Sequence, residues 1–218
     1  MGDPLDRWIQ SGRIRAQLGS DGVNDTPTIV IVGGLHGNEA GGLDAAQQVV
    51  NRLSALGHQW PGRLYVVAGN LQALRANTRF FDRDLNRGWS ERRAQKLRRV
   101  TAYEKCREDK EFLELLDLFD ALSAGSPHGL VLLDLHTTSG DAPPFSVITD
   151  HASNHHIARA LPMPSVLGFD RYVDEPILSY FARRHWPAIG IEGGRQGSVD
   201  AVHFLEEAVL RILGALGW

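Results

Sequence analysis

The chain has 218 residues, of which 43% are hydrophobic and 22% are charged. This balance is typical of a globular protein and excludes a collagen-like chain, a coiled coil and an intrinsically disordered tail. The formal net charge of −3 gives no indication that the chain binds nucleic acid or an anionic membrane surface. Because the single cysteine, Cys106, cannot form an intrachain disulfide, we expect the protein in the reducing cytoplasm.

The length of the chain predicts one domain over residues 1–218. Its apolar runs all fall short of the roughly 20 residues that cross a bilayer, and its first residues lack the apolar core of a signal peptide. We expect residues 1–26 to form an irregular or edge segment, because a run of turn-forming residues closes it.

Short apolar runs and helical periodicities alternate along the rest of the chain. In chain order, they predict a strand over 28–34, a helix over 38–56, a strand over 64–70, an arginine-rich loop through Arg87, a long helical region within 91–122, strands over 130–136 and 144–150, a helix over 175–185, a strand over 187–194 and a helix over 201–216. We therefore predict an α/β fold with a mostly parallel or mixed central sheet flanked by helices. Ligands of such sheets bind beyond the carboxyl ends of the strands.

The first predicted strand leads directly into the segment GGLHGNE, which contains His36 and Glu39. An imidazole nitrogen and a carboxylate oxygen are both suitable ligands for Zn²⁺. The glycines around them allow a tight turn, so that both side chains can reach one point. A solvated loop is the alternative interpretation of so short a motif.

The strand over 130–136 ends with Asp134 and His136, which lie on the same face because they are two residues apart. His136 can be a third metal ligand, and Asp134 can be the carboxylate that orients a ligating imidazole. Together with His36 and Glu39, these residues favour an open catalytic site for one zinc ion, with a position left for water. The alternative is a histidine that merely caps the end of a strand.

Two further segments carry groups that suit catalysis beside a metal ion. Glu192 follows an apolar strand, and burial there would raise its pKa and make it a usable general base. The segment 77–87 contains three arginines and Asn86, which can bind a carboxylate and stabilise an oxyanion. A salt-bridged or helix-capping glutamate and a solvated charged loop are the alternatives.

Four motifs, GGLHGNE, NTRFFDRDLNR, DLHTT and EGGRQ, follow one another between residues 33 and 196. In this order they resemble the signatures of the succinylglutamate desuccinylase/aspartoacylase family, a branch of the zinc carboxypeptidase fold. Each motif is short, and their co-occurrence carries the resemblance. The resemblance implies that His36, Glu39 and His136 bind zinc and that Glu192 activates a water molecule. It also implies that Arg79 polarises the scissile carbonyl and stabilises the tetrahedral oxyanion.

The resemblance further implies that Asn86 and Arg87 hold the carboxylate of an amino-acid substrate. Tyr180 and Arg184 have the spacing of a second contact to a substrate carboxylate, although their distance from Glu192 along the chain differs from that of the family. Members of the family usually add a C-terminal β-rich domain that narrows the entrance. Only 22 residues follow Gln196, so we expect this sequence to lack that domain and to have a more open site, either as a minimal catalytic domain or as a truncated member of the family.

These features predict a zinc-dependent amidohydrolase that cleaves the acyl–amide bond of a small N-acyl amino acid. A zinc carboxypeptidase that acts on peptide C-termini is the first alternative, and a more open site would favour it. A catalytically silent module that binds a metal or a carboxylate is the second alternative. The presence of Glu192 argues against the silent module, because such a module would not need a general base.

Overall fold

A seven-stranded sheet forms the centre of the fold. The computed structural model describes residues 5–19 and 26–218. Within them the strands are β1 (Ile14–Leu18), β2 (Thr28–Gly33), β3 (Leu64–Ala68), β4 (Leu130–Thr138), β5 (Phe145–Ile148), β6 (Ser165–Leu167) and β7 (Ala188–Arg195). Their order in the sheet is β1-β3-β2-β4-β7-β5-β6. The four consecutive strands β3, β2, β4 and β7 are parallel, whereas β1 and β5 pair antiparallel with β3 and β7.

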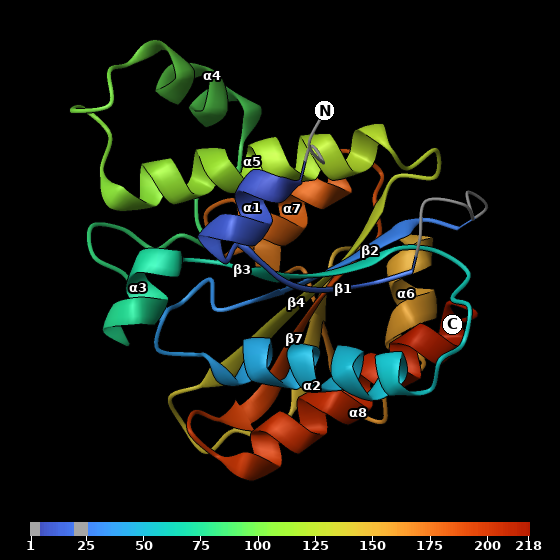
Figure 1. Ribbon diagram of the computed structural model, residues 1–218. Coiled ribbons are helices and arrows are strands. Elements are labelled where there is room, and N and C mark those ends of the chain that lie inside the picture. The colour runs from blue at the N-terminus through green and yellow to red at the C-terminus, as the bar shows by residue number, and fades with distance from the viewer. Residues whose placement is uncertain (1–4, 20–25) are drawn as a thin grey trace.

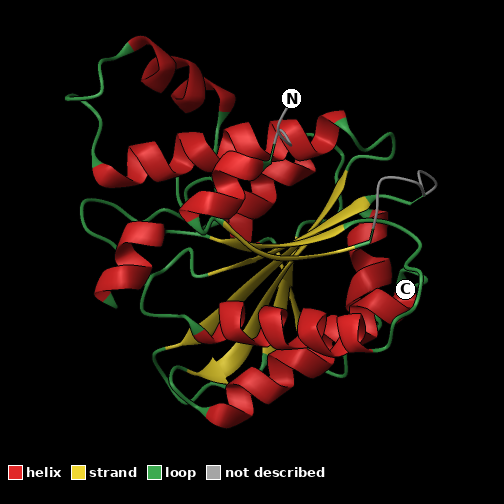
Figure 2. Cartoon of the chain, viewed as in Figure 1, coloured by secondary structure: helices red, strands yellow, loops and turns green. Residues whose placement is uncertain are grey.

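Helices cover both faces of this sheet (Figures 1 and 2). They are α1 (Asp6–Ser11), α2 (Gly41–Ala55), α3 (Leu71–Ala76), α4 (Glu91–Arg99), α5 (Arg107–Ala124), α6 (Ala152–Ala158), α7 (Ile177–Ala182) and α8 (Val199–Ala215), with a 3₁₀ turn, η1, at Phe169–Arg171. In Figure 1, α2, α6 and α8 lie below the sheet, and α1, α4, α5 and α7 lie above it. The prediction of an α/β fold with a mixed sheet flanked by helices is confirmed.

The strands divide their side chains between two apolar cores. In β2, Ile29 and Ile31 belong to the core between the sheet and the helices α2 and α8. Val30 and Val32 belong to the core between the sheet and the helices α5 and α7. This alternation follows from the two-residue period of a strand. Because both faces are covered, all six residues of β2 are buried, which explains the uninterrupted apolar run in the sequence.

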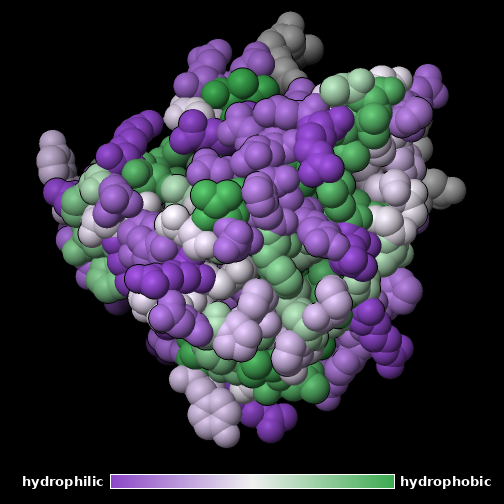
Figure 3. Space-filling model, turned by 90° about the horizontal axis from the view of Figure 1, so that it is seen from below, coloured by the Kyte–Doolittle hydropathy of each residue, from purple (hydrophilic) through white to green (hydrophobic). Residues whose placement is uncertain are grey.

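The outer surface of the lower helix layer is largely hydrophilic. Figure 3 shows the molecule from below, and hydrophobic residues lie there in separate groups between hydrophilic ones. This pattern is typical of amphipathic helices that bury one side against a sheet. Among the described residues, we find no helix with the length and apolar character that crossing a membrane requires.

The structure differs from the predicted elements in the region 70–124. The expected loop after β3 contains the short helix α3, which Asn70 caps by accepting a hydrogen bond from the Ala73 amide at 3.0 Å. The expected long helical region is two helices, because Val100 adopts an extended conformation at the end of α4. A new start follows at Cys106, whose amide donates to the Asp109 carboxylate. Local contacts at the helix ends therefore divide the predicted helical region into α4 and α5.

Smaller elements were also missing from the prediction. The helix α6, the strand β6 and the turn η1 lie between predicted elements. Of the segment 1–26, the described part forms α1 and the edge strand β1, in agreement with the expectation of an edge segment, while residues 1–4 and 20–25 lie outside the described residues.

We predict that Gly42→Ala destabilises the fold. A Cβ atom at Gly42 would lie 2.5 Å from the carbonyl oxygen of Leu135 and 2.8 Å from its Cβ, so α2 would have to move away from β4. Such overpacking costs about 1–3 kcal/mol of unfolding free energy, which denaturant titration measures.

Gly214→Ala is the matched control for this substitution. It lies in α8 with no atom within 4 Å of the added Cβ, so it should stabilise the fold by roughly 0.5–1 kcal/mol. A Gly42→Ala protein as stable as the parent chain would contradict the close packing of α2 on β4.

Candidate metal centre and active site

The carboxyl ends of three neighbouring parallel strands form the base of the site. In their register, Gly33 of β2 lies beside Leu135 of β4, and His136 of β4 lies beside Glu192 of β7. His36 follows β2 after a short turn. The strand ends therefore bring His36, His136 and Glu192 to the same edge of the sheet, where ligands of α/β folds bind.

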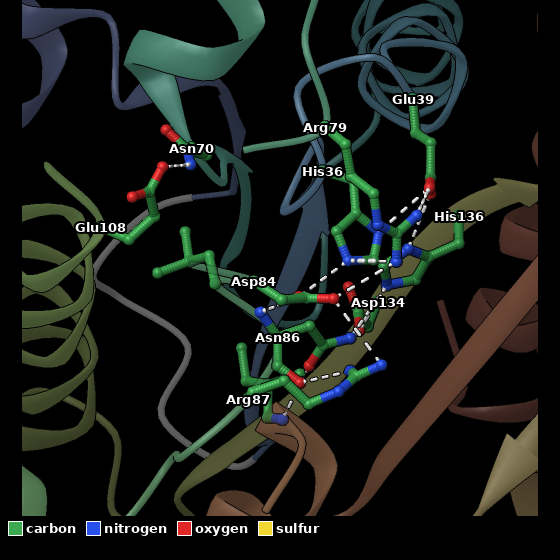
Figure 4. Close-up of polar contacts among 12 residues, drawn as sticks. His36, Glu39, Asn70, Arg79, Asp84, Asn86, Arg87, Glu108, Asp134 and His136 are labelled. Atoms are coloured by element: carbon green, nitrogen blue, oxygen red, sulfur yellow. Dashed lines mark hydrogen bonds and ion pairs between the residues drawn. The ribbon is translucent and has the colours of Figure 1, made fainter. Parts of the chain in front are cut away.

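The Glu39 carboxylate lies between two imidazole rings (Figure 4). Its Oε1 atom is 3.0 Å from Nδ1 of His36, and its Oε2 atom is 2.9 Å from Nδ1 of His136. One possible ligand atom from each of these residues lies within 4.8 Å of the other two, and all three side chains are buried. The sequence motif had predicted this convergence.

A second carboxylate holds the far side of each ring. Asp84 Oδ1 lies 2.9 Å from Nε2 of His36, and Asp134 Oδ2 lies 2.9 Å from Nε2 of His136. Both Nδ1 atoms consequently face Glu39. The contact of Asp134 with an imidazole agrees with the prediction, whereas the contact of Asp84 was not predicted. A histidine that binds a metal usually has a hydrogen-bond partner at its other ring nitrogen, and a search for such a partner of His36 could have pointed to Asp84.

The three side chains fit a zinc ion. The Nδ1 atom of His36 is buried and lies 3.0 Å from Glu39 Oε1, so two of the three possible ligand atoms already face one another away from solvent. Two imidazole nitrogens and one carboxylate oxygen are the protein ligands of an open zinc site. Since both Nε2 atoms already have carboxylate partners, the Nδ1 atoms are the ones left for a metal ion.

The charges of the cluster support one another. Burial alone would raise the pKa of Glu39, but hydrogen bonds from His136 and His36 lower it to about 2. Burial would lower the pKa of His136, but Asp134 and Glu39 raise it well above its ordinary value of 6.5. The pKa of His36 is raised despite burial by hydrogen bonds to Asp84 and Glu39. A metal ion that binds here would replace the protons on these rings.

Glu192 has the properties of a general base. Burial raises the pKa of its carboxyl, His136 opposes this rise, and the negative charges of Glu39 and Asp134 add to it. A raised pKa brings a carboxylate closer to the range in which it accepts and returns a proton efficiently.

The arginine-rich segment 77–87 lies over the metal centre. Arg79 donates from Nη1 to Glu39 Oε1 at 3.0 Å and from Nη2 to Asp84 Oδ2 at 3.3 Å. The Nη2 atom of Arg87 is 3.7 Å from Asp84 Oδ2. The Nδ2 atom of Asn86 lies 3.5 Å from Asp134 Oδ2. The alternative of a fully solvated loop does not hold for these three side chains.

A cavity of about 120 Å³ opens between this segment and the ends of β4 and β7. Its polar lining consists of His36, Arg79, Asn86, Arg87, Asp134, His136 and Glu192. Its apolar lining consists of Val147, Phe169, Pro176, Leu178 and Gly190. The predicted metal ligands, general base and substrate-binding side chains from the segment 77–87 thus lie in or beside one small pocket.

Tyr180 and Arg184 do not line this pocket, so the structure gives no support to the predicted contact with a substrate carboxylate. Tyr180 is buried beside Trp89, with ring centroids 5.8 Å apart. The Arg184 guanidinium stacks 3.7 Å from the centre of the Tyr180 ring and is paired with the Glu91 carboxylate. The ring and the guanidinium are used in contacts with Trp89 and Glu91, which the spacing of the two residues could not reveal.

The loop that carries Arg79 and Asp84 is anchored by Glu108, in the first turn of α5. Glu108 also accepts a hydrogen bond from Nδ2 of Asn70 at 3.1 Å (Figure 4). The fully buried Glu108 carboxylate accepts hydrogen bonds from the amides of Phe81 at 2.9 Å and Asp82 at 3.0 Å. From the sequence alone, Glu108 cannot be distinguished from the other charged residues expected on the surface of this helix. The structure shows that it fixes the conformation of the loop above the metal centre.

The chain is similar to known proteins along most of its length. Residues 25–215 match the family model of the succinylglutamate desuccinylase/aspartoacylase catalytic domain. A succinylglutamate desuccinylase of Burkholderia cenocepacia is 30% identical over 133 residues, which are 60% of this chain and 36% of that protein. Another, from Erwinia tasmaniensis, is 33% identical over 134 residues, or 60% of this chain and 37% of that protein. The chain therefore spans little more than a third of the length of these relatives.

Solved structures show the same fold. The succinylglutamate desuccinylase of Chromobacterium violaceum has a TM-score of 0.72 at 18% identity, over 95% of this chain and 72% of that one. Murine aminoacylase 3 has a TM-score of 0.60 at 24% identity, over 88% of this chain and 63% of that one.

We predict that Asp84→Asn weakens zinc binding by about 10–100-fold, the usual effect of losing a carboxylate that orients a ligating imidazole. The amide would no longer provide the charged acceptor at Nε2 of His36. Competition with a fluorescent zinc chelator measures the affinity.

Asp82→Asn is the control, because Asp82 is exposed in the same loop and its carboxylate contacts the Arg107 amide instead. If the two variants bind zinc with equal affinity, the contact between Asp84 and His36 does not support the metal centre.

Proposed function

The chain belongs to the succinylglutamate desuccinylase/aspartoacylase family, and we propose that it is a zinc-dependent amidohydrolase that cleaves the acyl–amide bond of an N-acyl amino acid. The observation that carries this proposal is the convergence of His36, Glu39 and His136 on one point, beside a pocket that His36, His136 and Glu192 line together. A metal-ligand set beside a carboxylate base is the arrangement that metal-assisted hydrolysis requires.

His36, Glu39 and His136 would hold the zinc ion, which would act as a Lewis acid on the acyl carbonyl and lower the pKa of a water molecule towards about 7. Glu192 would accept a proton from the attacking water. As the oxygen of that water bonds to the acyl carbon and the carbon–nitrogen bond breaks, Glu192 would return the proton to the leaving amine nitrogen. The products are a carboxylic acid and a free amino acid.

The segment 77–87 would orient the substrate. Arg79 has its guanidinium at the metal centre, where N–H groups can stabilise the negative charge that develops on the carbonyl oxygen. Arg87 and Asn86 line the same pocket, and a guanidinium with a neighbouring amide can bind a carboxylate directionally. The free carboxylate of an N-acyl amino acid fits these two side chains.

A zinc carboxypeptidase would use the same groups on the C-terminus of a peptide. Family membership favours the N-acyl amino acid. Amine release from N-acetylaspartate, N-succinylglutamate and other N-acyl amino acids, compared with release from short peptides, separates these functions. We expect activity on N-acyl amino acids that a chelator removes and zinc restores. Metal binding without hydrolysis of any of these compounds would indicate the silent module instead.

We predict that Glu192→Gln lowers kcat by about 10²–10⁴-fold, because the amide cannot accept the proton of the attacking water. Zinc content, measured by elemental analysis, should stay at one ion per chain, since Glu192 is not one of the three ligands. Glu207→Gln is the control, because Glu207 lies on the exposed side of α8 and pairs with Arg211. Turnover of the Glu192→Gln protein close to that of the control would refute the role of Glu192.

A further inference from the structure

We propose that the amino-acid part of the substrate has an apolar side chain, which packs against the wall formed by Val147, Pro176, Leu178 and Gly190. This inference rests on the proposed function and names its substrate class. It separates this chain from the compound in the name of its relatives, since N-succinylglutamate carries a carboxylate on its amino-acid side chain.

The apolar wall begins directly beside the residues proposed to hold the substrate carboxylate. The Oδ1 atom of Asn86 accepts a hydrogen bond from the Ile177 amide at 2.9 Å. The neighbours of Ile177, Pro176 and Leu178, both line the pocket. In an amino acid the carboxylate and the side chain are bonded to the same carbon. A substrate whose carboxylate is bound by Asn86 and Arg87 therefore brings its side chain to this wall.

Gly190 forms the part of the wall that lies between Leu178 and Val147. It lies in β7 two residues before Glu192, and thus on the same face of the strand. A Cβ atom on Gly190 would lie 3.4 Å from Cδ1 of Leu178 and 3.6 Å from Cβ of Val147. The three residues meet at one point, and a larger residue at position 190 would fill that part of the pocket. The whole cavity has a volume of about 120 Å³, and because the scissile amide and the carboxylate must share it, only a small side chain fits beside them.

The charges around the wall disfavour an acidic side chain. Gly190 pairs with Asp134 in the sheet register, and the carboxylates of Asp134 and Glu192 both border the pocket. Arg79 and Arg87 are the arginines among the described lining residues. Arg79 is bound to Glu39 and Asp84 at 3.0 and 3.3 Å, whereas Arg87 has a looser contact, 3.7 Å from Asp84, so Arg87 is the better placed of the two for one substrate carboxylate.

The two arginines that follow α7 are already paired. Arg184 is paired with Glu91, and Arg183 lies 3.6 Å from Glu175. A second substrate carboxylate would lose its water without gaining a cation, which is unfavourable. An apolar side chain loses no such hydration and gains contact with the wall.

The test compares kcat/KM for N-acetylleucine and N-acetylmethionine with kcat/KM for N-acetylaspartate and N-acetylglutamate. We expect the apolar substrates to be preferred by at least about tenfold, the lower end of what one or two well-placed groups achieve. Equal or better hydrolysis of the acidic substrates would overturn the proposal.

Binding to the zinc-loaded Glu192→Gln protein, measured by calorimetry, makes the test independent of turnover. Tighter binding of the apolar compounds supports the proposal even if the parent chain hydrolyses none of them, in which case the proposed function alone fails. Tighter binding of the acidic compounds, or binding of neither class, overturns it.

Two variants locate the preference in the wall. Gly190→Val should lower kcat/KM for N-acetylleucine about tenfold more than for N-acetylglycine, because N-acetylglycine has no side chain to displace. Leu178→Arg should shift the preference towards N-acetylglutamate by adding a cation at the wall. Leu167→Arg is the matched control, because Leu167 is exposed on β6, and it should leave the preference unchanged. An unchanged ratio in both wall variants would contradict the assignment of the wall.

Discussion

The register of β2, β4 and β7 is the constraint on which the site depends. His36 follows β2, His136 lies in β4 and Glu192 lies in β7. These residues are far apart along the chain, yet parallel pairing sets the ends of the three strands side by side. A shift of one residue in β4 would turn His136 and Asp134 to the opposite face, away from Glu39. The buried apolar residues of the strands resist such a shift, because each face of the sheet belongs to a different core. Core packing thus determines the geometry of the metal centre.

Two buried carboxylates near the start of α5 fix the conformation of the segments that follow β3. Glu111 pairs with the fully buried Arg13 and accepts the amide of Gln72 at 3.2 Å, which holds the start of α3. Glu108, one turn earlier, accepts the amides of the loop that carries Arg79 and Asp84. Buried polar groups of this kind are stable only when they are fully hydrogen-bonded, and they then fix one conformation. The loop above the candidate metal centre is therefore held by contacts with the protein itself.

The sequence was informative where one residue type or one short pattern suffices. The apolar runs predicted β2, β4 and β7, and the motifs around His36 and His136 predicted the side chains that converge. The roles of Asp84 and Glu108 could not be predicted, because they depend on contacts between segments that are far apart in the sequence and share no local pattern. Tyr180 and Arg184 show the opposite failure: their spacing suggested a substrate contact, but their side chains make their contacts away from the pocket. Spacing along a helix places two residues on one side of that helix and says nothing of what that side faces.

The charge of the site connects its catalysis with its selectivity. The carboxylates of Glu39, Asp84, Asp134 and Glu192 surround two guanidinium groups, those of Arg79 and Arg87. With neutral imidazoles, a divalent zinc ion would bring this set to neutrality. The first substrate carboxylate then adds a negative charge beside Arg87, and a second one would add another beside Asp134 and Glu192. Since charges interact strongly in a pocket with little water, the carboxylates proposed to support the metal ion and to act as the base would also oppose a doubly acidic substrate.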